Sequence, residues 1–160
     1  MTITAIYAGT FDPITLGHED VTRRAATLFG RIIIAIADSK SKKPLFTLDE
    51  RIAIGREVFS DVKNVEVMGF SGILMDFARQ QDARVVVRGV RSVTDFDYEF
   101  QLAGMNRSLY PQVETVFLTP GVEYAYVSAT LVREIALLGG DASRFLSPGV
   151  AARLAEKAKR

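Results

Sequence analysis

The residues best suited to chemistry begin in segment 7–18, which reads Tyr-Ala-Gly-Thr-Phe-Asp-Pro-Ile-Thr-Leu-Gly-His. The apolar run Ile3–Ala8 leads into it and an amphipathic run to about Phe29 follows, so the order predicts strand, turn and helix. Thr15 can cap this helix, which places His18 in its first turn. Because N–H groups and the positive end of the helix dipole gather there, the segment predicts an anion site beside His18. The residues alone leave a second interpretation open, a surface histidine at the start of a helix.

Three further segments could bind anions at the ends of strands or the start of a helix. Arg88-Gly89-Val90-Arg91 follows an apolar strand directly, and its two arginines could hold two anionic groups. Ser39–Pro44 carries three lysines, which could attract phosphate or form an ordinary solvated loop. In segment 124–130, Ser128 and Thr130 can cap the next helix, where the same N–H groups could hold phosphate.

Apolar strand-like runs alternate with helical patterns along the chain. Continuous β-branched runs such as Ile32-Ile33-Ile34 are typical of strands buried on both faces of a parallel sheet. The predicted strands are Ile3–Ala8, Arg31–Ala37, Val65–Val67, Arg84–Arg88 and Glu114–Leu118. Predicted helices cover about 17–29, 48–59, 73–81, 95–109, 128–138 and 148–157, with a capping box at Thr47–Glu50, a stop at Gly139-Gly140, and Ser147-Pro148 as a cap and first-turn proline.

These repeated units predict an α/β fold, a single-domain, doubly wound sheet of about five parallel strands spanning residues 1–160. Ligands in such sheets bind beyond the carboxyl ends of the strands, where the strand order reverses. If the first and fourth strands are neighbours at that point, the turn 9–18 faces segment 88–91. The G-x-G-x-x-G fingerprint and the P-loop pattern are both absent from the sequence, which argues against a Rossmann dehydrogenase or a P-loop kinase.

Composition excludes several classes of site. A chain of 160 residues with 48% hydrophobic and 24% charged residues is typical of one soluble globular domain. The net charge of +1 gives no support to a general nucleic-acid or membrane-surface binder. Without cysteine there is no disulfide, thiolate metal site or cysteine nucleophile, and the single histidine excludes multi-histidine metal sites. No leader-like or membrane-length apolar run is present, so we expect a cytoplasmic protein.

Thr15-Leu16-Gly17-His18, following Gly-Thr-Phe-Asp-Pro, resembles the T-x-G-H signature of the nucleotidylyltransferase superfamily. With the later segments, the chain resembles the phosphopantetheine adenylyltransferase family. The matching motifs are Ser-Lys-Lys-Pro-x-Phe-Thr-Leu at 41–48 and Arg-Gly-x-Arg at 88–91 followed by Asp-Phe-Asp-Tyr-Glu at 95–99. The resemblance extends from Ala5 to about Leu146 with similar spacings between motifs, which is far more specific than the tetrapeptide alone.

The resemblance implies adenylyl transfer from ATP to 4′-phosphopantetheine, giving dephospho-coenzyme A and pyrophosphate. It assigns transition-state stabilisation to His18. It implies phosphopantetheine contacts for Thr10, Lys42, Leu74 and Arg88, those of Leu74 through its backbone. It implies ATP contacts for Thr10, Phe11, His18, Gly89, Val90, Arg91, Glu99, Tyr124, Ala125, Tyr126, Val127, Ser128, Ala129 and Thr130. From the residues alone, Glu99 could equally be a solvent-facing helical carboxylate, Leu74 part of an ordinary core stripe, and Ser128 a helix cap and nothing more.

The chain departs from the family pattern at a few positions. Val127 replaces isoleucine, and Ala129 replaces a serine and so lacks a hydroxyl, which leaves backbone contacts as the safer expectation there. Ala8 stands where many relatives have proline. The resemblance also implies Mg²⁺ as a cofactor, without a dedicated carboxylate cage, and a homohexamer. Two other functions stay open: a sibling nucleotidylyltransferase with another phosphate acceptor, and a non-catalytic nucleotide or coenzyme A sensor.

Overall fold

The longest apolar runs form the centre of one parallel sheet in the computed structural model, which describes residues 2–39 and 43–159. The strands are β1 (Thr4–Gly9), β2 (Arg31–Ala37), β3 (Val65–Phe70), β4 (Val85–Gly89) and β5 (Glu114–Leu118). Their order is β3-β2-β1-β4-β5, and every neighbouring pair is parallel. The predicted five-stranded α/β fold is confirmed, and β1 and β4 are neighbours, which was the condition for the turn 9–18 to face segment 88–91.

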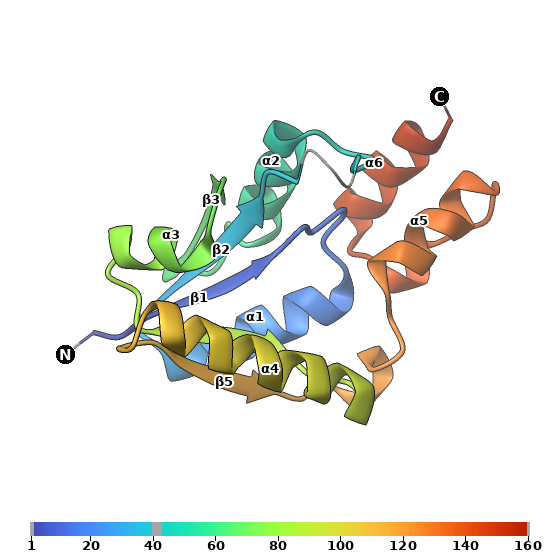
Figure 1. Ribbon diagram of the computed structural model, residues 1–160. Helices are drawn as coiled ribbons and strands as arrows, with labels where there is room; N and C mark the ends of the chain where they lie inside the picture. The colour runs from blue at the N-terminus through green and yellow to red at the C-terminus, as the bar shows by residue number, and fades with distance from the viewer. Residues whose placement is uncertain (1, 40–42, 160) are drawn as a thin grey trace.

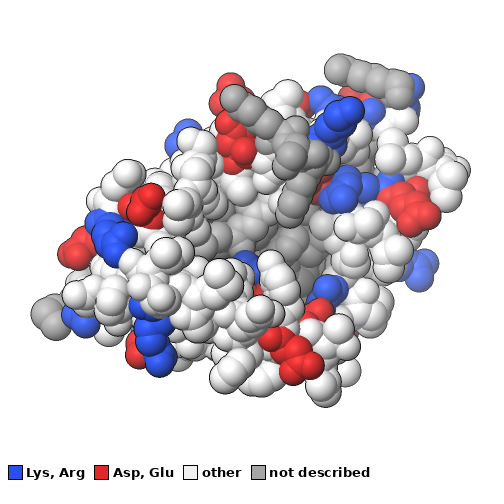
Figure 2. All heavy atoms as spheres, viewed as in Figure 1, with Lys and Arg blue, Asp and Glu red and all other residues white. Residues whose placement is uncertain are grey.

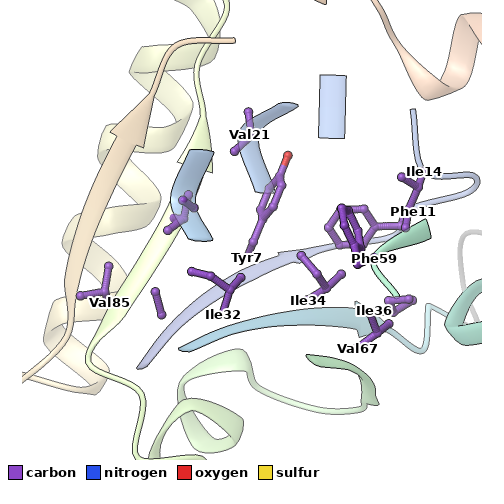
Figure 3. Close-up of a cluster of buried hydrophobic side chains, with 13 residues drawn as sticks. Tyr7, Phe11, Ile14, Val21, Ile32, Ile34, Ile36, Phe59, Val67 and Val85 are labelled. Carbon is purple, nitrogen blue, oxygen red and sulfur yellow. The ribbon is translucent and has the colours of Figure 1, made fainter. Parts of the chain in front are cut away.

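Helices cover both faces of this sheet (Figure 1). Side chains of α1 (Leu16–Leu28) and α2 (Leu48–Val58) pack on one face, as the cluster around Val21, Ile34 and Phe59 in Figure 3 shows. On the other face α3 (Leu74–Gln80) packs with residues that follow α4 (Val93–Leu109). This division follows from the strand alternation, because neighbouring residues such as Ile33 and Ile34 point to opposite faces.

The last part of the chain forms two helices that lie beyond the carboxyl ends of the strands (Figure 1). The helices α5 (Ala129–Leu137) and α6 (Pro148–Ala158) pack with α2 through a third apolar cluster that includes Val132 and Leu154. Two 3₁₀ turns, η2 (Val122–Tyr124) and η3 (Ser143–Phe145), precede these helices and were not predicted. These helices therefore lie near the topological switch point, which is the place between β1 and β4 where the strand order of the sheet reverses.

Caps set most of the helix starts. The Thr47 capping box is confirmed, with the Glu50 N–H 3.1 Å from the Thr47 hydroxyl. The helix α4 begins two residues before the prediction because the Ser92 hydroxyl accepts from the N–H of Asp95. Ser147 is a correction: Pro148 takes the first-turn position as expected, but the Ser147 hydroxyl does not cap α6 and donates instead to buried Glu19 at 2.7 Å.

Candidate active site

A cavity of about 340 Å³ opens at the carboxyl ends of β1 and β4. It is bounded by the turn after β1, the start of α1, the end of β4, the first part of α4 and the approach to α5. Its lining is Tyr7, Ala8, Gly9, Phe11, Thr15, Gly17, His18, Val21, Arg88, Gly89, Arg91, Asp95, Glu99, Pro120, Tyr124, Val127, Ser128, Ala129 and Thr130. Its position is the one expected for a ligand site in a doubly wound sheet, and its volume lies within the range of small-molecule sites.

His18 lies in the first turn of α1, and the backbone of Thr15 holds its ring through a hydrogen bond. The N–H of Thr15 donates to Nδ1 of His18 at 3.0 Å, and the Thr15 hydroxyl accepts from the N–H of His18 at 3.3 Å. This is a capping box in which the histidine ring takes the place of the usual glutamate. Because Nδ1 accepts a hydrogen bond, the proton of the neutral ring is on Nε2. The ring of Phe11 packs edge-on against the imidazole, with 4.9 Å between centroids.

The surroundings of His18 keep this ring uncharged at neutral pH. Burial, followed by the positive charges of Arg91 and Arg88, lowers the pKa of His18 to about 4. The neutral tautomer with Nε2–H can donate a hydrogen bond to an anionic oxygen. It cannot act as a general base at Nδ1, because that nitrogen is already occupied.

Arg88 is held on the cavity wall by two elements. Its Nε and Nη2 each lie 2.7 Å from a different carboxylate oxygen of Glu99, and Nη1 donates to the carbonyl of Ala8 at 2.8 Å. Burial would lower the pKa of Arg88, but the hydrogen bonds and charge of Glu99 outweigh it and raise the pKa. Glu99 itself is 7% exposed. The interpretation of Glu99 as a solvent-facing carboxylate is therefore wrong.

Arg91 connects the end of β4 with the start of α5. Its Nη1 donates to the carbonyl of Val127 at 2.7 Å, and its Nε lies 3.4 Å from the carboxylate of Asp95. Ser128 caps α5 as predicted, accepting from the N–H of Leu131. The two arginines of the Arg-Gly-x-Arg motif thus line the same cavity, and each is paired with a carboxylate of α4, Arg88 with Glu99 and Arg91 with Asp95.

Tyr7 also lines the cavity, although we did not assign it or its hydroxyl group to the site from sequence. Its ring rises from β1 among apolar side chains toward α1, as Figure 3 shows, and the residue is 8% exposed. Burial raises the pKa of Tyr7 to about 12, against the lowering effect of Arg88 and Arg91, so its hydroxyl stays protonated at neutral pH. A β-carbon added to Gly89 would lie 3.9 Å from this oxygen. Among the residues that the structure describes, the hydroxyl has no hydrogen-bond partner.

A buried polar network fixes the turn that carries Phe11. Arg51 of α2, 1% exposed, donates to the carbonyls of Thr10, Ala37 and Phe46 at 2.9, 2.9 and 3.1 Å. The carboxylate of Asp12 accepts from the N–H groups of Leu45 and Phe46 at 2.8 and 2.9 Å, while Arg133 of α5 donates to the Asp12 carbonyl. Phe11 adopts a φ of 49°, which this network holds in place.

Most of the predicted site residues meet in the cavity. Those that line it are Phe11, His18, Arg88, Gly89, Arg91, Glu99, Tyr124, Val127, Ser128, Ala129 and Thr130. Thr10, Val90, Ala125 and Tyr126 belong to the same segments but do not line it, and Lys42 lies outside the described residues. Leu74 packs with the apolar cluster on the other face of the sheet. Their contacts with substrates stay predictions.

Sequence reasoning also missed Asp95, although it stands in a motif that we quoted. Its carboxylate and that of Glu99 both line the cavity, and each faces an arginine.

In residues 2–39 and 43–159 no three His, Asp or Glu side chains gather into a group that could hold a metal ion. None of the described helices is both long and apolar enough to cross a membrane. On the face shown in Figure 2, acidic and basic side chains are interspersed.

Comparison with known proteins identifies the family. Residues 6–135 match the model of the cytidylyltransferase-like family. The chain is 61% identical over 153 residues to a phosphopantetheine adenylyltransferase of Aromatoleum aromaticum, covering 96% of this chain and 94% of the relative. It is also 61% identical over 152 residues to the phosphopantetheine adenylyltransferase of Nitrosomonas eutropha, covering 95% and 93%.

Solved structures agree on the fold. A putative nicotinate-nucleotide adenylyltransferase from Vibrio parahaemolyticus superposes with a TM-score of 0.69 at 18% identity, covering 96% of this chain and 99% of that one. A bifunctional NMN adenylyltransferase/ADP ribose pyrophosphatase from Francisella tularensis gives a TM-score of 0.76 at 14% identity, covering 100% and 51%. Such identities support the fold alone. The full-length relatives decide the family: the chain belongs to the phosphopantetheine adenylyltransferases, within the cytidylyltransferase-like proteins.

Proposed function

We propose that this protein transfers the adenylyl group of ATP to 4′-phosphopantetheine, a step of coenzyme A biosynthesis. A phosphate oxygen of the acceptor forms a bond to the α-phosphorus of ATP, the bond to the β-phosphate oxygen breaks, and pyrophosphate leaves. Dephospho-coenzyme A is the second product. One observation supports this most: the motifs from both halves of the chain meet in one cavity. The chain that carries them is 61% identical to a named family member.

The cavity offers positioning and charge stabilisation, which is what this reaction needs. A phosphate nucleophile is already anionic at neutral pH, so no general base is required. His18 can donate Nε2–H to an equatorial oxygen of the α-phosphate, where negative charge grows as the reaction proceeds. Arg88 and Arg91 supply cations on the β4 side, and Ser128, Ala129 and Thr130 line the cavity at the start of α5, where helix N–H groups can bind phosphate.

Mg²⁺ belongs to this proposal as the partner of ATP. The two cavity carboxylates, Asp95 and Glu99, are each engaged by an arginine, so the described residues favour an ion held mainly by phosphate oxygens and water. Bound in that way, it would neutralise part of the triphosphate charge. Asp95, at 34% side-chain exposure, is the carboxylate most open to such an ion.

The homohexamer is a further expectation from the family. The helix α4 exposes large apolar side chains that suit contact between copies of the chain: Val93, Tyr98, Phe100, Met105 and Leu109 are 80%, 63%, 65%, 61% and 51% exposed. The cytoplasmic location is an expectation from the sequence and stays a prediction.

Pyrophosphate release with a panel of acceptors tests the proposed function. The purified protein is given ATP and Mg²⁺ with 4′-phosphopantetheine, nicotinamide mononucleotide, a polyol phosphate, or no acceptor. We expect release that depends on 4′-phosphopantetheine, with dephospho-coenzyme A found by mass spectrometry. Release with another acceptor alone would instead support a sibling transferase, and binding of ATP or coenzyme A without release would support a sensor.

A further inference from the structure

Arg51 of α2 is a buried cation whose hydrogen bonds, among the described residues, go to backbone carbonyls and not to a carboxylate. The residue is 1% exposed, and its Nη1 donates to the carbonyls of Thr10 and Ala37 while its Nε donates to that of Phe46. Burial lowers the pKa of Arg51, yet an arginine stays charged at neutral pH in proteins. Because a buried cation costs free energy that an apolar side chain would not, these contacts indicate a role beyond filling the core.

The three carbonyls belong to three segments that meet near the cavity. Thr10 directly follows β1, Ala37 is the last residue of β2, and Phe46 precedes the start of α2. A guanidinium is planar and presents its N–H groups in fixed directions, so it can hold three acceptors at set positions. Arg51 therefore fixes the turn after β1 relative to the end of β2 and to α2.

The backbone of Phe11 is restrained on both sides of the residue. On one side Arg51 holds the carbonyl of Thr10, and on the other Arg133 of α5 donates to the carbonyl of Asp12 at 2.7 Å. Phe11 has a φ of 49°, a conformation that is sparsely populated by residues other than glycine. Such a conformation persists only where the surroundings determine it, and Arg51 supplies one of the two restraints.

The ring of Phe11 connects this turn to His18. It is 4% exposed and packs edge-on against the imidazole, with 4.9 Å between centroids and 69° between the planes. The ring also meets that of Tyr7 edge-on at 5.3 Å, and a β-carbon added to Gly9 would lie 3.2 Å from it. Because the Phe11 ring is confined between the end of β1 and the imidazole, a shift of the turn should move it against His18.

We propose that Arg51 is a positioning residue for His18: by holding the carbonyl of Thr10, it keeps the ring of Phe11 packed against the imidazole. A donor to a transition-state oxygen has to be placed closely, and a displacement of about 1 Å can cost about a hundredfold in rate. The effect on turnover rests on the proposed function. The effect on the imidazole does not, because it can be measured without substrates.

Arg51→Lys tests the effect on turnover. The variant keeps the charge, but a single ammonium cannot occupy the positions of Nε and Nη1 at once. We expect kcat for pyrophosphate release to fall about tenfold to a hundredfold. The Michaelis constants for ATP and 4′-phosphopantetheine should stay within about threefold, because the bond from His18 strengthens mainly in the transition state.

A double variant tests whether Arg51 acts through His18. Adding Arg51→Lys to His18→Ala should lower kcat by less than about threefold beyond the loss in His18→Ala, since both changes then affect the same group. A loss from Arg51→Lys that is equally large with and without His18 would overturn the inference.

NMR of ¹⁵N-labelled histidine tests the position of the ring without turnover. In Arg51→Lys, looser packing of Phe11 should let water reach the imidazole, so the pKa of His18 should rise from about 4 toward 6.5. Arg88 and Arg91, the charged groups whose fields act on this ring, are unchanged in the variant. If Arg51→Lys does not fold, Phe11→Leu removes the aromatic edge contact directly and should raise the same pKa. An unchanged pKa in the variant measured would overturn the inference.

Ile33→Val is the control for a general loss of stability. Ile33 is 0% exposed and packs on the opposite face of the sheet from Phe11, so the variant loses a buried methyl group away from the turn. Its thermal unfolding midpoint should fall while kcat and the pKa of His18 stay as in the parent. An Arg51→Lys protein that behaves in the same way would show a purely structural role and overturn the inference. A parent without turnover would overturn the proposed function, and the NMR measurement would still decide whether Arg51 positions His18.

Discussion

At the scale of single residues, the backbone N–H of Thr15 selects the tautomer of His18, the residue for which we propose the stabilising role. The Thr15 N–H occupies Nδ1, so the ring proton faces away from the helix start. The same arrangement removes the ring as a base and makes it a neutral donor. The sequence placed His18 in the first turn of a helix, but it could not show that the ring itself completes the capping box, since that depends on its rotamer.

The protonation state of His18 can be measured directly, because it is the only histidine in the chain. With ¹⁵N-labelled histidine, NMR shifts should show the Nε2–H tautomer at neutral pH and a pKa well below 6.5, near the value of about 4. Since the unfolded chain binds this proton first as pH falls, stability from the neutral ring should be lost between pH 6.5 and about 4. A midpoint at or above 6.5 would show that the ring is not held neutral.

Tyr7→Phe tests the unassigned hydroxyl in the cavity. The variant removes one oxygen that has no partner among the described residues, so thermal stability should not fall. Because this oxygen lies beside Gly89 on the α1 side, we expect ATP binding to weaken about tenfold, the value of one hydrogen bond to a charged group. Tyr110→Phe, an equally buried tyrosine outside the cavity, is the control. Unchanged ATP affinity with lower stability would assign the hydroxyl a structural role.

At the scale of elements, the site exists because β1 and β4 are neighbours whose carboxyl ends point the same way. The buried strands were predictable because a central parallel strand has to be apolar on both faces. The strand β3 was predicted only to Val67, since Met68-Gly69-Phe70 breaks the β-branched pattern and pairs through its backbone. The Arg88–Glu99 pair depends on how α4 folds back over β4, which spacing alone does not give.

The connection between β4 and α5 predicts the effect of Arg91→Ala. The variant loses both a cation and the contact with the Val127 carbonyl that locates the start of α5. We expect a higher Michaelis constant for ATP or a lower turnover, with little change in binding of 4′-phosphopantetheine. Arg107→Ala, which removes an exposed pair with Glu114, is the control. If only acceptor binding suffers, the roles of the two arginines are exchanged.

At the scale of the whole molecule, segments far apart in the chain line one cavity, from the turn after β1 to the start of α5. Tyr7 and Asp95 were not predicted as lining residues. In the sequence, a tyrosine in an apolar strand looks the same as a core residue, and an aspartate in a helix looks the same as a surface residue. Their place in the cavity follows only from the assembled sheet.

The exposed apolar side chains of α4 predict assembly. Analytical ultracentrifugation should give the mass of six 17.6-kDa chains. Phe100→Glu, which replaces one of these side chains with a charge, should lower the mass and leave the secondary structure intact. Leu28→Glu, at a residue 63% exposed on α1, is the control and should not change it. A parent that sediments as a single chain would contradict the homohexamer.

The most direct test of the mechanism is the turnover of His18→Ala. Removing one hydrogen-bond donor to a developing oxyanion typically lowers kcat by about a hundredfold to a thousandfold. The variant should fold, as thermal unfolding checks, and bind ATP and 4′-phosphopantetheine within about tenfold of the parent, because the bond strengthens mainly in the transition state. Steady-state pyrophosphate release should then show that loss in kcat, whereas a kcat within about threefold of the parent would contradict a catalytic role for His18.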